Sequence, residues 1–184
     1  MPLTQLDDRA ALILIDLQKG IVANAPAQAA AQIVDRAAQL AKAFRAQGLP
    51  VVLVNVTGPA PGRTDQRRPA FSPPPDWAEL VPELDQQPGD IRVTKHRIGA
   101  FIGTNLQEEL HNRGVTQVFF AGISTSVGVE STARSAYDHG YHVVFVSDAM
   151  TDRDAEIHQF CVARIFPRLG EVDTTQSVLE RLRT

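Results

Sequence analysis

The chain has 184 residues, of which 43% are hydrophobic and 21% charged, and its formal net charge is −3. These values predict one globular domain over residues 1–184 and exclude a basic nucleic-acid surface, because positive charge gathers only in the Arg67–Arg68 pair. No stretch approaches the roughly 20 apolar residues of a membrane span, and no signal-peptide pattern is present, so we expect a cytoplasmic protein without a membrane partner. A single cysteine, Cys161, excludes an internal disulfide and a cysteine-based zinc site.

The first third of the chain alternates between strand and helix patterns. The apolar run Ala10–Asp16 is short, continuous and ends in a charge, which is typical of a strand buried on both faces. Residues 27–47 place their apolar side chains on one helical face, and Gly48 follows as a C-cap. A second strand at Pro50–Val56 precedes a long ordered loop at residues 57–76, which holds six of the twelve prolines.

The same alternation continues to the C-terminus. Two further helices end in a glycine (Gly114 and Gly140) that is followed within two residues by a strand signal. This regularity predicts an α/β fold, a six-stranded, mainly parallel sheet with helices on both faces. The remaining strands are expected at Ile91–Thr94, Gln117–Gly122, His142–Ser147 and, at the sheet edge, Glu171–Thr174, and the remaining helices at Asn105–Arg113, Val127–His139, Ala155–Phe166 and the C-terminus.

Reactive groups follow three separate strands of the expected sheet. Asp16 ends the first strand, with Gln18 two residues on, and Lys95 follows the third. The fourth strand runs into the small-residue turn Gly122–Val129, which opens a helix. Ligands of such sheets bind at the carboxyl ends of the strands, and a helix start offers N–H donors to a carboxylate or an oxyanion. The sequence therefore predicts a ligand site at this edge.

Each of these groups also has a purely structural interpretation. Asp16 and Lys95, each taken alone, are explained without a ligand site if their side chains are solvated or if they form an ion pair without catalysis. A capped helix entry explains the turn, with Ser124, Thr125 or Ser126 as the N-cap. Only the combination of the three segments points to chemistry.

The three segments together carry a family resemblance. The stretches ALILIDLQ, GDIRVTKHRIGAFIGTNL and GISTSVGVESTARSAYDHGYHVVFVSDAM occur in the order and at the distances found in the isochorismatase-like hydrolase superfamily, which this sequence resembles. The resemblance implies a three-layer fold with strand order 3-2-1-4-5-6 and a small-molecule substrate. It also implies a homo-oligomer, a dimer or tetramer, in which the aromatic residues of segment Phe71–Trp77 are candidates for an interface or a lid.

The resemblance also assigns roles to individual residues. In the cysteine members, the residue that matches Gly128 is the nucleophile, Asp16 matches its base, and Lys95 matches the cation that holds both. The N–H groups of Ser124 and Gly128 would form the oxyanion hole, and the Ile123–Ser124 peptide would be cis. The substrate-binding residues implied in the same way are Gln18, Phe101, Ser124 and Thr125.

The sequence departs from the cysteine members at the decisive position. Glycine has no side chain, so Gly128 cannot attack a carbonyl and an acyl-enzyme is unavailable there. Cys161 lies in a helix whose residues Phe160, Ala163 and Phe166 suggest a packed face, and is interpreted as a buried core thiol. The Asp-x-His pattern of the metal-binding branch is absent and the histidines are dispersed, so no metal and no cofactor are expected.

Isochorismatases show which reaction remains without the cysteine. They hydrolyse a vinyl ether without a covalent intermediate, and in the phenazine-pathway member a glycine occupies the cysteine position. By resemblance, Asp16 is a general acid or base assisted by Lys95, although burial and the neighbouring ammonium shift the pKa of Asp16 in opposite directions, which leaves its protonation open. Arg63 and Arg97 are candidates for a substrate carboxylate, or simply solvated arginines.

Two alternatives stay open beside this cysteine-independent hydrolase. The first is a non-catalytic small-molecule-binding relative that lost activity with the cysteine. The second is a hydrolase in which Ser124 or Ser126 supplies the nucleophile, although no histidine lies in the motif to activate either hydroxyl.

Overall fold

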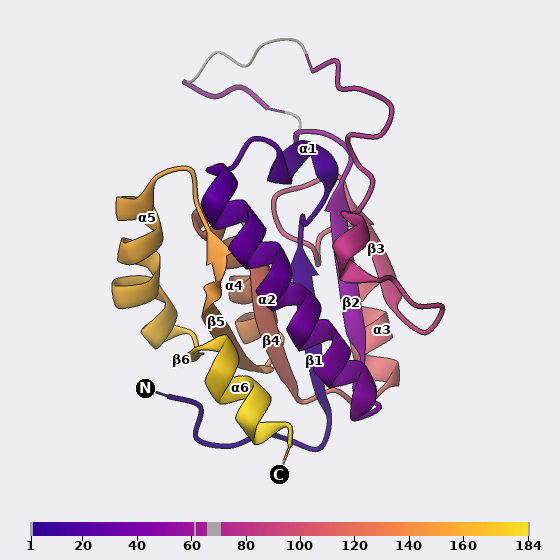
Figure 1. Ribbon diagram of the computed structural model, residues 1–184, viewed down its shortest axis with the longest axis vertical. Helices are drawn as coiled ribbons and strands as arrows, with labels where there is room; N and C mark the ends of the chain where they lie inside the picture. The colour runs from indigo at the N-terminus through magenta and orange to yellow at the C-terminus, as the bar shows by residue number, and fades with distance from the viewer. Residues whose placement is uncertain (1, 61, 66–70, 184) are drawn as a thin grey trace.

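Six parallel strands form a single sheet in the order β3-β2-β1-β4-β5-β6, as the family resemblance predicts. The structure, a computed structural model, describes residues 2–60, 62–65 and 71–183 (Figure 1). Strands β1 and β4 are buried along their whole length, because helices cover both faces of the sheet. The strands are β1 (Ala10–Ile15), β2 (Val51–Val56), β3 (Ile91–Lys95), β4 (Gln117–Ile123), β5 (His142–Thr151) and β6 (Glu171–Asp173).

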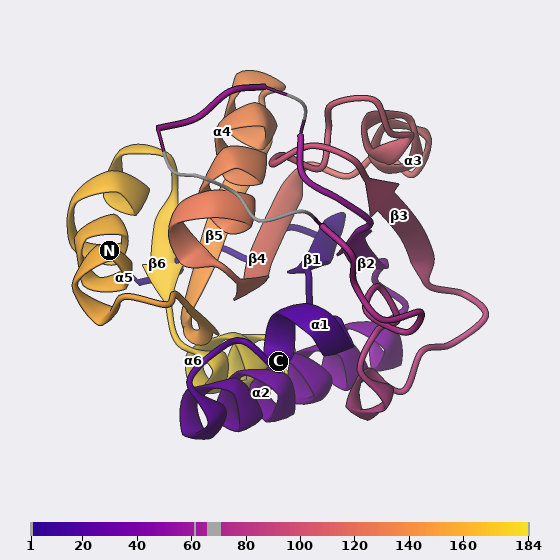
Figure 2. The ribbon, with the colours of Figure 1, turned by 90° about the horizontal axis from the view of Figure 1, so that it is seen from above.

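The helices divide between the two faces of this sheet. Figure 2 shows α2 (Ala27–Ala46) and α6 (Thr175–Arg181) on one face and α3 (Leu106–Asn112) and α4 (Glu130–Asp138) on the other. A separate apolar core lies on each side, the first around Phe44 and Phe119 and the second around Phe120, Phe145 and Phe166. A short helix α1 (Lys19–Val22) follows β1, and α5 (Ala155–Phe160) lies beside β6. No helix in the described part of the chain is long and apolar enough to cross a bilayer.

Most predicted elements are confirmed to within a residue or two, and the differences concern helix and strand ends. The strand predicted to stop at Ser147 continues to Thr151, after a register shift in its pairing with β4. The helix predicted from Val127 begins instead as a π-helical turn over Thr125–Val129. Short helical turns at Lys19–Val22 and Pro82–Leu84 were not predicted, since neither is long enough to show periodicity.

The helix predicted at Ala155–Phe166 is also divided. After α5 the chain forms a π-helical turn (Cys161–Ile165) and then a 3₁₀ turn (Phe166–Arg168). Helix α5 has no buried residue, so that Phe160 is 58% exposed, and Ala163 is exposed as well, whereas Cys161 and Phe166 are buried. The predicted packed face was therefore wrong at Phe160 and Ala163, but the prediction of a buried thiol is confirmed. Of the predicted loop at 57–76, residues 61 and 66–70, with the Arg67–Arg68 pair, lie outside the described residues.

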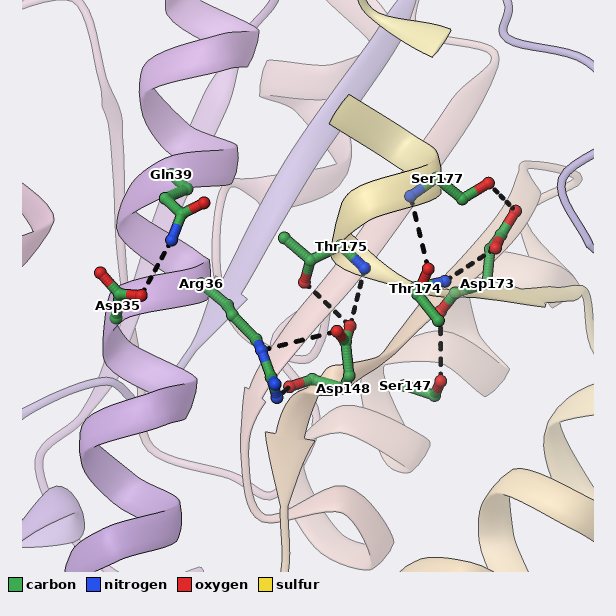
Figure 3. Close-up of polar contacts among 9 residues, drawn as sticks. All are labelled: Asp35, Arg36, Gln39, Ser147, Asp148, Asp173, Thr174, Thr175 and Ser177. Atoms are coloured by element: carbon green, nitrogen blue, oxygen red, sulfur yellow. Dashed lines mark hydrogen bonds and ion pairs between the residues drawn. The ribbon is translucent and has the colours of Figure 1, made fainter. Parts of the chain in front are cut away.

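A polar clamp joins three elements that are distant in sequence (Figure 3). Asp148, in β5, accepts hydrogen bonds from the backbone N–H and the hydroxyl of Thr175, the first residue of α6, at 2.7 and 2.8 Å. The same carboxylate lies 3.5 Å from the guanidinium of Arg36 in α2. Because a carboxylate at a helix N-terminus satisfies free N–H groups, this clamp fixes α6 against α2 and the sheet.

Candidate functional site

A buried ion pair lies where β1 and β3 end. The Nζ atom of Lys95 lies 2.8 Å from Oδ2 of Asp16, and both side chains are less than a tenth exposed. Lys95 also donates to the backbone oxygen of Arg97 at 3.3 Å. Two strands that flank β2 thus bring the predicted pair together at the carboxyl edge of the sheet. Figure 1 shows this end of the molecule, where α1 lies beside the ends of β1 and β2.

Asp16 carries two signs of strain. Its φ of 52° lies in the left-handed region, which a non-glycine residue rarely adopts and which tends to persist at functional sites. Its Oδ1 atom is buried and has no hydrogen-bond partner among the described residues. Burial raises the pKa of Asp16 to about 6, although the charge of Lys95 and its hydrogen bond act in the opposite direction. Desolvation therefore outweighs the ion pair.

Gly128 lies directly beside this carboxyl group. A Cβ atom at Gly128 would lie 3.2 Å from Oδ2 of Asp16 and 2.8 Å from Cγ2 of Ile15. Any side chain at position 128 would therefore crowd Asp16 and Ile15, and glycine lets the backbone of the turn lie close to the carboxyl group. The Ile123–Ser124 peptide that precedes this turn is cis, as predicted.

A pocket of about 410 Å³ opens above the pair, a volume suited to a small metabolite. Its polar lining comes from the ends of several strands, and its apolar lining includes the rings of Phe71 and Trp77, whose centroids lie 5.0 Å apart in an edge-on arrangement. The aromatic residues of segment Phe71–Trp77 thus form part of the pocket wall. The charged and small residues that line the pocket are Asp16, Gly58, Lys95, Arg97, Ser124, Gly128, Asp152 and Arg153.

Three residues that the resemblance placed in substrate binding lie outside this lining, and for each the structure shows another role. Gln18 is fully buried and joins α1 to β2, because its amide bonds both backbone groups of Val56 and the carbonyl of Trp77. Phe101 is buried in the second core, with its ring 5.1 Å from that of His139. Thr125 is fully buried and its hydroxyl lies 2.8 Å from Nδ1 of His158. Ser124 alone of this group lines the pocket.

The hydroxyl of Ser126 and the thiol of Cys161 both make hydrogen bonds to carboxylates. Ser126 donates from its hydroxyl and its backbone N–H to Oδ2 of Asp152, both at 2.8 Å. Ser124 occupies the N-cap position, one of the three predicted, but its side chain makes no cap hydrogen bond, and Asp152 accepts from the N–H at the helix entry instead. The thiol of Cys161 donates to Glu130 at 3.3 Å, and burial raises its pKa to about 12, so it stays protonated and unreactive at neutral pH.

The prediction missed the acidic and basic residues that follow β5. Asp152 and Arg153 line the pocket just beyond the end of that strand. The rule that ligand groups follow strand ends would have found them if β5 had been predicted to its true end at Thr151. Arg63, by contrast, is exposed and does not line the pocket, whereas Arg97 does.

Comparison with known proteins assigns the chain to a family. The Isochorismatase domain matches residues 10–177. The chain belongs to the isochorismatase family. Among members of this family, the protein YwoC of Bacillus subtilis is 41% identical over 95% of each chain. A crystal structure of an isochorismatase family protein from Burkholderia thailandensis, 41% identical, superposes with a TM-score of 0.90 over 97% of this chain and 98% of the other.

A third relative is less similar in sequence, but its name states the biosynthetic pathway in which it takes part. Phenazine biosynthesis protein PhzD of Pseudomonas fluorescens is 29% identical over 94% of this chain and 86% of its own length. The motifs that carried the resemblance all lie inside the matched domain, which spans every strand of the sheet. Family membership thus accounts for the fold and the order of the strands, while substrate and reaction rest on the site itself.

Proposed function

We propose that this isochorismatase-family protein is a cysteine-independent hydrolase of a small metabolite, and that it cleaves a vinyl ether of the isochorismate type. In this proposal Asp16 is the general acid, Lys95 orients it, and Gly128 lines the pocket beside the carboxyl group without a side chain. The N–H groups of Ser124 and Gly128, which the family resemblance assigns to the oxyanion hole of the cysteine members, have no oxyanion to bind in this reaction, because the substrate becomes positively charged. No metal or cofactor takes part.

One observation carries the proposal, the unpartnered Oδ1 atom of Asp16. Leaving a buried polar atom without a partner costs about 1–3 kcal/mol, so such an atom is best explained by a partner that arrives with the ligand. Burial raises the pKa of Asp16 to about 6, and this favours the protonated form that a general acid needs. The carboxyl group also lines the pocket.

The chemistry needs one proton donor and one water molecule. Asp16 transfers its proton to the terminal alkene carbon of the vinyl ether, which gives an oxocarbenium ion. Water adds to the carbon that bears the ether oxygen and returns a proton to the Asp16 carboxylate. The resulting hemiketal then breaks its ether bond and yields a ketone and an alcohol. No enzyme–substrate bond forms at any step, so glycine at position 128 is compatible with the reaction.

Glycine at the nucleophile position supports this choice over amide hydrolysis. The sequence resemblance associates glycine at the nucleophile position with the phenazine-pathway isochorismatase, and PhzD matches nearly the whole chain. The protonated thiol of Cys161 and the occupied hydroxyl of Ser126 also argue against a covalent route.

An assay of Asp16→Asn tests the proposal. The wild type and the variant are incubated with isochorismate, chorismate and a set of small amides, and products are measured by chromatography. We expect turnover of a vinyl ether by the wild type and a loss of at least about 100-fold in Asp16→Asn, the usual contribution of a general acid. Asp35→Asn, a substitution on the exposed surface of α2, is the matched control. Retained turnover in Asp16→Asn would remove this residue from the mechanism.

Thermal unfolding and intact-protein mass, measured with the same compounds, separate the two alternatives. A wild type that is stabilised by these compounds but consumes none of them would favour a non-catalytic binding protein. A mass increase on the intact protein during turnover would instead point to a covalent adduct on Ser124 or Ser126.

A further inference from the structure

The pocket has an excess of positive charge although the whole chain is acidic. Its lining contains three cationic side chains, Lys95, Arg97 and Arg153, against two carboxylates, Asp16 and Asp152. The chain as a whole carries a formal charge of −3. Protonation of Asp16, whose pKa is raised to about 6, increases the excess further. A cleft of this kind attracts and concentrates anions.

The two carboxylates do not neutralise the arginines. Oδ2 of Asp16 pairs with Lys95. The Oδ2 atom of Asp152 accepts from the N–H and hydroxyl of Ser126, and its Oδ1 atom accepts from the backbone N–H of Arg153 at 2.8 Å. Within the described part of the chain, neither Arg97 nor Arg153 has an ion pair with a carboxylate.

The backbone of Arg153 is held in place at the edge of the pocket by a hydrogen bond. Its N–H and the backbone N–H of Ser126, in the turn that carries Gly128, donate to the same Asp152 carboxylate, so the backbone of Arg153 is held beside this turn. Arg97 lies in the segment after β3, where its backbone oxygen accepts a hydrogen bond from Lys95. The aromatic side chains Phe71 and Trp77 supply the apolar wall of the same pocket.

We infer that Arg153, with Arg97, selects substrates that carry a carboxylate on a flat apolar body, and that Arg153 is the main determinant of this specificity. The guanidinium groups bind the carboxylate in the charge-assisted geometry that arginine favours, while the body of the substrate lies against Phe71 and Trp77. This inference rests on the proposed function of the same site and names the class of substrate that it accepts. The prediction from sequence named Arg63 and Arg97, and Arg153 replaces the first of these.

Binding of a matched pair of probes tests this inference without turnover. Benzoate and benzamide have nearly the same size and shape but differ in charge, and both are titrated by calorimetry into the wild type, Arg153→Gln and Arg97→Gln. We expect the wild type to bind benzoate at least about tenfold more tightly than benzamide. Arg153→Gln should reduce this preference to about threefold or less and leave benzamide affinity unchanged, and Arg97→Gln should have a smaller effect.

The control removes one positive charge outside the pocket. Arg92→Gln changes an exposed arginine of β3 that bonds Gln86, and it should keep the full preference for benzoate. Equal binding of the two probes by the wild type, or an unchanged preference in Arg153→Gln, would overturn the inference. The titration is also independent of the hydrolase proposal, because Asp16→Asn should lose turnover and still prefer benzoate.

Discussion

At the scale of single residues, the main feature of the site is Asp16, whose conformation and surroundings are energetically unfavourable. Asp16 has a left-handed backbone, a buried side chain and one oxygen without a partner among the described residues. Each feature costs free energy, and Lys95 offsets the cost only in part. A protein gains nothing structurally from this arrangement, which is why we place the chemistry here.

The raised pKa of Asp16 predicts a specific dependence of stability on pH. Because the folded state holds this proton more tightly than the unfolded chain, ionisation of Asp16 lowers the free energy of unfolding as pH rises from about 4 to about 6. The loss is at most about 3 kcal/mol and is complete above pH 6. Urea unfolding from pH 4 to 7.5 should reveal this component as the difference between the wild type and Asp16→Asn. Identical slopes in the two proteins would contradict the prediction.

Gly128 predicts a penalty for even one added carbon. In Gly128→Ala the new Cβ atom would lie 2.8 Å from the side chain of Ile15, so the core must shift. We expect a loss of about 1–3 kcal/mol in the free energy of unfolding, as for other overpacked sites. Gly89→Ala is the matched control, since a Cβ there meets nothing within 4 Å. Equal stability of the two variants would show that the space beside Asp16 is not tightly bounded.

At the scale of elements, the pocket wall depends on how α1 holds the segment after β2. The backbone N–H of Lys19 donates to Glu79 and that of Gly20 to Trp77, at 2.8 and 2.9 Å. The Lys19 ammonium adds ion pairs to Asp76 and Glu79, which raise its pKa although all three side chains are largely exposed. Trp77 can then pack directly on Gly20, and this close approach sets the position of the aromatic wall.

Gly20→Ala should therefore move Trp77. A Cβ atom at position 20 would lie 1.9 Å from the indole ring, so the ring must leave its place. Trp77 is the only tryptophan of the chain, and its fluorescence reports the change directly. We expect a shift in the emission maximum and about tenfold weaker binding of benzoate, against no change in Gly89→Ala. An unaltered emission spectrum would mean that Trp77 does not rest on Gly20 in solution.

At the scale of the whole molecule, polar contacts add to the hydrophobic core that packs α2, β5 and α6 together. The clamp around Asp148 links α2, β5 and α6, and Figure 3 shows its carboxylate between Arg36 and Thr175. Whether copies of this molecule assemble into a dimer or tetramer stays a prediction, which light scattering after size exclusion would decide.

Removal of the Asp148 carboxylate should loosen α6. Asp148→Ala leaves the first N–H and the hydroxyl of Thr175 without their acceptor and removes the ion pair of Arg36, which keeps its hydrogen bond to the backbone oxygen of residue 148. We expect a loss of about 1–2 kcal/mol in the free energy of unfolding, the usual cost of losing a cap. Asp35→Ala, which removes only a contact with Gln39 on the exposed face of α2, should cost less than about 0.5 kcal/mol. A similar cost for both variants would argue against the clamp.

The sequence by itself determined the order of the elements, the parallel sheet and the meeting of Asp16, Lys95 and Gly128 at one edge. These follow from local periodicity and from the rule that strand ends of a parallel sheet converge. The ends of β1, β3 and β4 differ from prediction by a single residue at most, so that the residues beyond them were placed correctly.

Only the tertiary structure decided which polar groups are free to bind a ligand. Gln18 follows the same strand as Asp16, yet its amide is used by backbone groups of β2 and the segment before Glu79. Asp152 and Arg153 reach the pocket because β5 continues past a register shift in its pairing with β4. Such hydrogen bonds join distant parts of the chain, and no local pattern encodes them, whereas the apolar periodicity that builds the sheet is local.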